Sequence, residues 1–137
     1  MTCLDSTFLI DLLRGNEPAR IKYGELRSNS ELEKDRAEPL CTTIVNAYEL
    51  AKGAMLTKDP EKNLKLVHEL LSELVILELD LESVDVASKL YSELCGKGKL
   101  VVEFDTLIAS ICIANSQKLV TNDKDFASIT KLTLLRY

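Results

Sequence analysis

The chain has 137 residues, the usual length of a single domain, and we expect one domain over residues 1–137. Hydrophobic residues make up 46% and charged residues 28%, with five glycines and three prolines, which excludes a disordered chain. The formal net charge of −5 excludes the overall basic field that many nucleic-acid-binding proteins carry. It does not exclude a local site, because carboxylates that hold divalent cations present positive metal to a phosphate.

The sequence contains no predicted targeting or membrane segment. The apolar opening is interrupted by Asp5 and Asp11, and it lacks the basic start and cleavage site of a signal peptide. No run approaches the roughly 18 apolar residues of a transmembrane helix. The cysteines are widely spaced without a Cys-x-x-Cys pair, which favours reduced, buried thiols over a zinc site or disulfides. We therefore predict a cytoplasmic protein in which all four cysteines are reduced and buried, namely Cys3, Cys41, Cys95 and Cys112.

The first third of the chain predicts a strand, two helices and a second strand. Residues 2–4 form a short apolar run, and Ser6 can cap a helix that ends at Gly15. The highly charged residues 17–38 predict a helix followed by a loose, solvated segment. The next short strand is expected over residues 40–43.

The central part predicts three further helices and one strand. A helix over residues 44–55 is expected to bury one stripe of side chains, with Tyr48 packed in the core. Another helix follows Asp59-Pro60, and residues 75–79 form a β-rich apolar strand. Residues 81–95 predict a helix that ends at a glycine pair. The expected buried stripes are Ile44, Ala47, Tyr48, Ala51 and Met55 in the first helix, and Val84, Ala87, Leu90, Tyr91 and Leu94 in the last.

The last third predicts a helix that begins with an acid on its apolar face. Ile108, Ala109 and Cys112 lie three, four and seven residues after Asp105, so the carboxylate shares the face that packs inward. Strands are expected over residues 118–121 and 132–135, with a turn and a short helix between them. Strands that alternate with helices predict a three-layer α/β/α sandwich with a central parallel sheet of four to five strands.

Four acids stand where ligands gather in such sheets, outside the carboxyl ends of the strands. Asp5 follows the first strand, Asp123 and Asp125 follow the strand over residues 118–121, and Asp105 begins the helix before it. Carboxylates crowded in one pocket require a hard cation, and oxygen ligands favour Mg²⁺ or Mn²⁺. Each acid also has a simpler interpretation, since Asp5 and Asp105 could cap helices and Asp123 could serve a turn.

Four segments stand out in the sequence, in chain order: CLDSTFLIDLLRG at residues 3–15, YELAKGA at 48–54, FDTLIA at 104–109 and LVTNDKDF at 119–126. Together they resemble the four motifs of PIN-domain ribonucleases, in particular VapC-like toxins of toxin-antitoxin pairs. The resemblance covers essentially the whole chain, and only the polar segment over residues 24–38 departs from the family pattern, by its length.

The resemblance implies a metal-dependent ribonuclease that hydrolyses RNA phosphodiester bonds. Asp5, Asp105 and Asp123 would hold Mg²⁺ or Mn²⁺, and Glu49 would bind the metal directly or through water and help position the attacking water. Asp125 is a spare ligand. The motifs are compatible with one bound metal ion or with two. The resemblance also implies a small antitoxin partner, whose arginine would pair with the carboxylates, and a homodimer.

Other residues near the motifs have secondary roles in this interpretation. Hydroxyl and amide groups could hold a carboxylate or a phosphate, or could cap helices, and Arg14 and Lys52 are candidates for phosphate contacts. Asp11 is expected to be a solvated acid. His68 is not expected to act as a general base, because its position implies no acidic or nucleophilic partner. The hydroxyl and amide groups belong to Ser6, Thr7, Thr121 and Asn122.

Other classes fit less well. In a phosphoacceptor receiver domain Asp80 would be the phosphorylated residue, but Asp5 lacks the acidic neighbour and the final strand lacks the lysine that such domains have. A haloacid-dehalogenase phosphatase needs Asp-x-Asp, whereas Asp5 is followed by Ser6 and Thr7. An RNA-processing nuclease and a non-catalytic PIN module for RNA binding or assembly both remain as alternatives.

Overall fold

A computed structural model describes residues 1–32, 39–100 and 102–137. It contains one five-stranded sheet in the order β3-β2-β1-β4-β5, and all four strand pairs are parallel. The elements are β1 (Thr2–Leu4), α1 (Ser6–Leu13), α2 (Glu17–Leu32), β2 (Cys41–Thr43), α3 (Ile44–Met55), α4 (Pro60–Ser72), β3 (Val75–Leu77), α5 (Leu81–Gly96), α6 (Glu103–Ala114), β4 (Lys118–Val120), the 3-10 helix η1 (Lys124–Ser128) and β5 (Leu134–Leu135).

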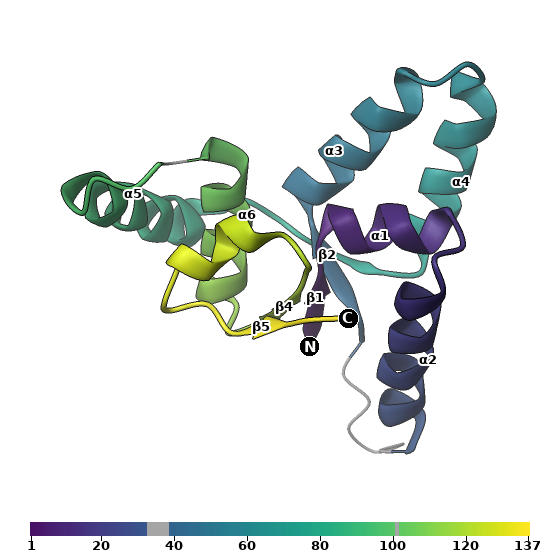
Figure 1. The fold of residues 1–137 in the computed structure, drawn as a ribbon, viewed down its shortest axis with the longest axis horizontal. Helices are drawn as coiled ribbons and strands as arrows, with labels where there is room; N and C mark the ends of the chain where they lie inside the picture. The colour runs from purple at the N-terminus through teal and green to yellow at the C-terminus, as the bar shows by residue number, and fades with distance from the viewer. Residues whose placement is uncertain (33–38, 101) are drawn as a thin grey trace.

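Helices lie on both sides of the sheet, as the three-layer prediction requires (Figure 1). Side chains alternate between the two faces along each strand, so neighbouring residues of β1 enter different cores. Cys3 packs with α5, α6 and η1 in one core, whereas Leu4 packs with α1, α2, α3 and α4 in the other. Burial on both faces explains why these short strands are apolar without alternation.

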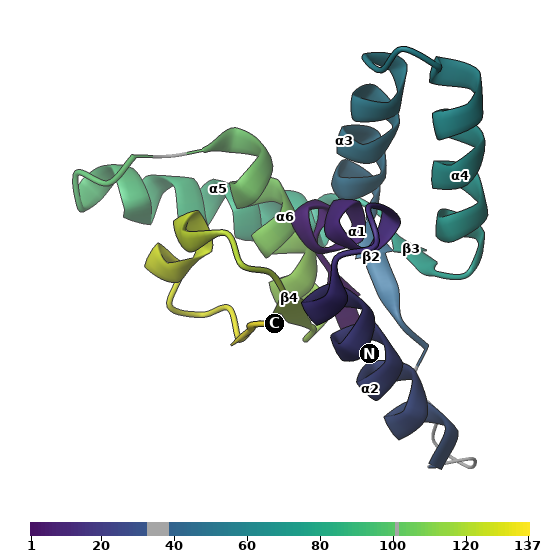
Figure 2. The same ribbon diagram turned by 45° about the vertical axis from the view of Figure 1, so that its right-hand side comes forward.

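The chain order places a topological switch at β1. From β1 the chain moves outward through β2 to β3, and it then returns to add β4 on the other side of β1. Figure 2 shows β2 and β3 on the side of α3 and α4, away from β4. The backbone N–H of Asp5 donates to the carbonyl of Val120 at 3.1 Å, which joins the carboxyl ends of β1 and β4.

Side-chain caps begin several helices where the sequence has Asp or Thr. The Asp80 carboxylate accepts from the backbone N–H of Ser83 at 2.9 Å and so begins α5. Thr43 caps α3, and Asp59 caps α4 immediately before Pro60. Asp80 thus has a structural function as a helix cap, which agrees with the rejection of a receiver domain.

The predicted buried face of α3 is wrong. Ile44, Tyr48 and Met55 are more than 40% exposed, and the buried residues are Val45, Asn46, Leu50 and Ala54. The helix has apolar residues on most of its circumference, so periodicity alone did not fix its orientation. The side that faces inward contains a polar residue, Asn46, whose hydrogen bonds make its burial acceptable.

Smaller corrections concern α5 and one cysteine. Val84 and Tyr91 are exposed on α5, while Ala87, Leu90 and Leu94 are buried as expected. Cys95 is exposed, whereas the other three cysteines are buried, and all four are free thiols. The helix predicted from residue 17 is α2, but most of the predicted loose segment, residues 33–38, lies outside the described residues. Among the described helices, none has the length and apolar character to cross a membrane.

Candidate acidic metal site

Asp5 is a buried acid at the end of β1, with only 2% of its surface exposed. Its Oδ2 atom accepts hydrogen bonds from the Thr7 hydroxyl at 2.9 Å and from the Thr121 hydroxyl at 2.7 Å. Burial raises the pKa of Asp5, and these two hydroxyls partly offset the rise. Although Asp5 precedes α1, its side chain makes no cap hydrogen bond, so the helix-cap interpretation is wrong.

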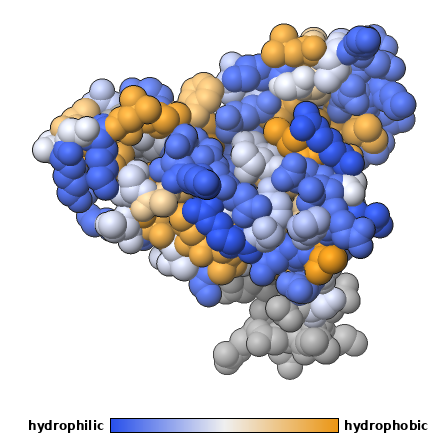
Figure 3. All heavy atoms as spheres, in the orientation of Figure 1, coloured by the Kyte–Doolittle hydropathy of each residue, from blue (hydrophilic) through white to orange (hydrophobic). Residues whose placement is uncertain are grey.

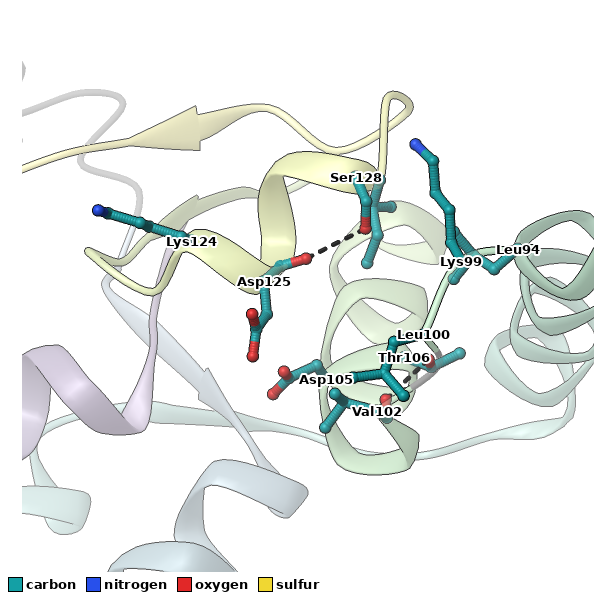
Figure 4. A pocket seen from close by; sticks show the side chains of 10 residues that line it. Leu94, Lys99, Leu100, Val102, Asp105, Thr106, Lys124, Asp125 and Ser128 are labelled. Atoms are coloured by element: carbon teal, nitrogen blue, oxygen red, sulfur yellow. Dashed lines mark hydrogen bonds between the residues drawn. The ribbon is translucent and has the colours of Figure 1, made fainter. Parts of the chain in front are cut away.

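Three further carboxylates meet beside the end of β4. Asp105 on α6, Asp123 and Asp125 have oxygen atoms that all lie within 4.8 Å of one another. Figure 4 shows the carboxyl groups of Asp105 and Asp125 pointing toward one another in a cavity of about 270 Å³. Asp123 also caps η1 by accepting from the backbone N–H of Asp125 at 2.9 Å, so its turn function coexists with its place in the cluster.

Asp105 is close enough to the other acids for their charges to affect its pKa. Burial raises the pKa of Asp105 to about 7, and the negative charges of Asp123, Asp5, Glu49 and Asp125 contribute to this rise. Val102 is the N-cap residue of α6, and Asp105 lies in the first turn of the helix, where its negative charge also interacts favourably with the helix dipole. A half-buried acid that shares a site with like charges is ionised more completely at neutral pH when a cation is bound beside it.

Glu49 joins this cluster from α3. Its Oε1 atom accepts from the Ser6 hydroxyl at 3.1 Å, and Ser6 follows Asp5 in the chain. Burial raises the pKa of Glu49, the Ser6 hydrogen bond and the nearby Lys52 lower it, and the charges of Asp5 and Asp123 raise it further. Glu49 is therefore close to the two acids at the ends of β1 and β4.

Other residues considered in the sequence lie outside the cluster. Asp11 is not simply solvated, because it accepts a 2.6 Å hydrogen bond from the hydroxyl of Tyr137. His68 is exposed on α4. Arg14 lines a second pocket of about 230 Å³ between α1, α3 and α4, and Glu49 also lines this pocket. Asn122 pairs with the backbone of Tyr137 rather than with a carboxylate.

Two residues that support the site were missed in the sequence. Asn46 is fully buried, accepts from the backbone N–H of Ser6 at 3.1 Å and donates to the carbonyl of Leu4 at 3.5 Å, on either side of Asp5. Arg136 donates to the carbonyls of Thr121 and Asp123 at 3.1 and 3.0 Å. No motif marked them, because their partners are backbone atoms that only the folded chain brings near.

The donor set fits a hard divalent cation. Asp105, Asp123 and Asp125 offer only carboxylate oxygens, which suit Mg²⁺ or Mn²⁺. A cation would also lower the cost of ionising Asp105 and Asp5, whose pKa values are raised without it. An open parallel sheet with an acidic, metal-compatible cluster at its switch point is typical of a class of metal-dependent phosphodiester hydrolases.

Comparison with known proteins identifies the family within that class. The PIN domain model matches residues 2–132, and the chain belongs to the PIN-domain family. It is 27% identical over 120 residues to the tRNA(fMet)-specific endonuclease VapC of Shigella flexneri, covering 88% of this chain and 84% of that protein. It is 29% identical over 97 residues to ribonuclease VapC2 of Haemophilus influenzae, covering 70% of this chain and 74% of that protein.

The same similarity extends to a solved structure. A crystal structure of VapBC2 from Rickettsia felis, bound to a DNA fragment from their promoter, superposes with a TM-score of 0.87 at 25% identity. The superposition covers 99% of this chain and 98% of that one. The parallel sheet and flanking helices of this chain are therefore shared with that structure.

Proposed function

We propose that this protein is a metal-dependent endoribonuclease and the toxin of a toxin-antitoxin pair. The observation that carries the proposal is the convergence of Asp5, Glu49, Asp105 and Asp123 from four separate parts of the chain on one end of the sheet. The curated relatives are named as VapC ribonucleases, and one similar structure is a VapBC complex. A non-catalytic module would have no need to retain all four acids.

In this proposal Asp105 and Asp123 hold Mg²⁺ or Mn²⁺, with Asp125 as an additional ligand on the same side. Asp5 completes the site from β1, where the hydroxyls of Thr7 and Thr121 fix the orientation of its carboxylate. A bound metal would supply Lewis acidity to the scissile phosphate and would make a water molecule more acidic. Because these hydrogen bonds hold Asp5 in one rotamer, its carboxylate would bind a cation without reorganising.

Glu49 has a different role from the other acids. Its link to Ser6 and its raised pKa suit a group that accepts a proton from the attacking water or orients that water. By analogy with the family, the attacking water would displace the 3′ oxygen from phosphorus and leave a 5′ phosphate and a 3′ hydroxyl. Cytoplasmic RNA is the corresponding substrate pool.

The test is cleavage of a mixed RNA pool by the purified protein with Mn²⁺, with Mg²⁺ and with chelator. Asp5→Asn and Asp105→Asn should abolish metal-dependent cutting, whereas Asp85→Asn, at an exposed acid of α5, should cut normally. End-labelling should detect 5′ phosphates on the products. A folded, metal-bound protein free of bound inhibitor that leaves the whole pool intact would overturn catalysis and favour the binding module.

The proposed partner is a small antitoxin protein. The pocket between α1, α3 and α4 is lined mostly by apolar residues and also by Glu49, which suits an apolar segment followed by a cation that pairs with this carboxylate. Figure 3 shows hydrophobic surface among hydrophilic side chains over α3 and α4. Leu66→Glu in this pocket should abolish co-purification with the antitoxin and leave RNA cleavage intact.

The homodimer also stays a prediction, which sedimentation velocity would test.

A further inference from the structure

An exposed aromatic pair bridges the two helices that carry Glu49 and Asp105. The rings of Tyr48 on α3 and Phe104 on α6 meet edge to face, with centroids 5.7 Å apart and planes at 90°. Tyr48 is 53% exposed and Phe104 is 37% exposed. Two large aromatic rings that contact one another at the surface offer an apolar face to a ligand, unlike a single scattered apolar side chain.

A cation accompanies the two rings. The Nζ atom of Lys52 lies 5.3 Å from the centroid of Tyr48 and 5.5 Å from that of Phe104. Lys52 is one helical turn after Tyr48 and close enough to Glu49 to lower its pKa. Its long, exposed stem can carry the ammonium from the rings to a neighbouring anion without moving the helix.

This aromatic and cationic group adjoins the acidic cluster. Tyr48 immediately precedes Glu49, and Phe104 immediately precedes Asp105. A nucleotide chain whose phosphate lies at the carboxylates therefore has a neighbouring base within reach of the rings. We propose that the Tyr48–Phe104 pair stacks an unpaired base beside the bond that is cut, and that Lys52 contacts the adjoining phosphate. This inference rests on the proposed function and makes its substrate single-stranded RNA.

The chemistry of the group favours single-stranded RNA over a duplex. Aromatic side chains stack on bases that are already unstacked and exposed, as in loops and ends, whereas the bases of a duplex present no free face. Lysine supplies charge to the backbone in a protein that is acidic overall. A second copy of this chain packed on the rings is the alternative occupant, and the experiment below distinguishes it.

Binding of a fluorescein-labelled single-stranded RNA of mixed sequence is measured by anisotropy with Mn²⁺ present, in a Glu49→Gln background that keeps Asp5, Asp105 and Asp123 but removes the group proposed to accept a proton from the attacking water. This measurement tests the proposal apart from catalysis. Tyr48→Ala and Phe104→Ala should each weaken binding by roughly 5- to 100-fold, and Tyr48→Phe should bind like the parent. Lys52→Gln should reduce the slope of log affinity against log salt by about 0.7. Ile44→Ala, which removes an exposed apolar residue one turn before Tyr48, is the matched control and should not alter RNA binding.

Each other outcome overturns either the inference or the proposed function. Unchanged RNA affinity in folded Tyr48→Ala and Phe104→Ala, or no binding by the parent protein, would overturn the stacking site, even if the parent cuts RNA. A shift from dimer to monomer on sedimentation, produced by Ile44→Ala as well as Tyr48→Ala, would assign the surface to a second copy. Ring-dependent binding by a parent protein that never cuts RNA would retain the site and reject the nuclease.

Discussion

Ionisation of Asp105 is costly in the metal-free protein, because burial and four neighbouring acids raise its pKa to about 7. The folded state therefore binds this proton more tightly than the unfolded chain, whose aspartate titrates near pH 3.8. The contribution of Asp105 to the free energy of unfolding falls as the pH rises from about 4 to about 7, and it stays low above that range. The ionised acid is destabilising at neutral pH unless a cation is bound.

We therefore expect Asp105→Asn to raise the thermal midpoint of the metal-free protein at pH 8 and to have a smaller effect at pH 5. Melting curves in chelator at the two pH values measure this difference. Asp85→Asn, on an exposed part of α5, should shift the thermal midpoint equally at the two pH values. If Asp105→Asn also shifts the midpoint equally at pH 5 and pH 8, the cluster does not raise the pKa of Asp105.

Arg136 is a positioning residue for the loop after β4. Its guanidinium donates to the carbonyls of Thr121 and Asp123, whose side chains serve Asp5 and the carboxylate cluster. Arg136→Ala should lower Mn²⁺ affinity by about 10- to 100-fold, as loss of a supporting group does in other metal sites. Isothermal titration with Mn²⁺ measures it, and Arg136→Lys should recover part of the affinity. Arg20→Ala, at an exposed site on α2, is the control.

At the scale of elements, α3 shows how a buried polar residue orients a helix. Asn46 accepts from the backbone N–H of Ser6 and donates to the carbonyl of Leu4, so it joins α3 to the end of β1. Thr42 adds a 2.7 Å hydrogen bond to the same carbonyl. These bonds hold the side of α3 that bears Glu49 toward Asp5.

Asn46→Ala should destabilise the protein by roughly 1–3 kcal/mol, because the buried N–H of Ser6 loses its partner. Urea unfolding monitored by circular dichroism gives the free energy of unfolding for comparison with the parent. The matched control is Asn63→Ala on α4, whose hydrogen bond to Thr57 is exposed and whose loss should cost much less. Equal losses in the two variants would contradict the role given to Asn46.

Sequence patterns predicted the sheet and the acidic ends of β1 and β4 because both follow local rules. Apolar runs mark the strands, and an acid placed directly after a strand, such as Asp5, lies at the carboxyl edge of a parallel sheet. The buried face of α3 could not be predicted, because the helix has apolar residues on most of its circumference. Tyr48 and Leu50 are both apolar enough for the core, yet only Leu50 is buried. Asn46 and Arg136 depend on backbone partners distant in sequence, which no local pattern contains.

At the scale of the whole molecule, metal binding and folding are linked. Carboxylates from α6, η1 and the loop before η1 come together only in the folded protein, so a cation that binds them stabilises that state. Mn²⁺ at about 100 times its dissociation constant should add about 2.7 kcal/mol to the free energy of unfolding. Thermal melts with and without Mn²⁺ measure the shift. Asp123→Asn should abolish most of it, Asp85→Asn should keep it, and a shift common to both would indicate nonspecific binding.

The hydrogen bond between Thr121 and Asp5 spans 116 residues of chain, and it has a consequence for synthesis. A growing polypeptide on the ribosome has β1 and Asp5 long before it has β4, Asp123 or Arg136. Until β4 has been made, Asp5 lacks the hydroxyl of Thr121 and the cluster lacks Asp123. The complete carboxylate cluster therefore assembles only after β4 has paired with β1, so the order of synthesis delays the formation of the metal site.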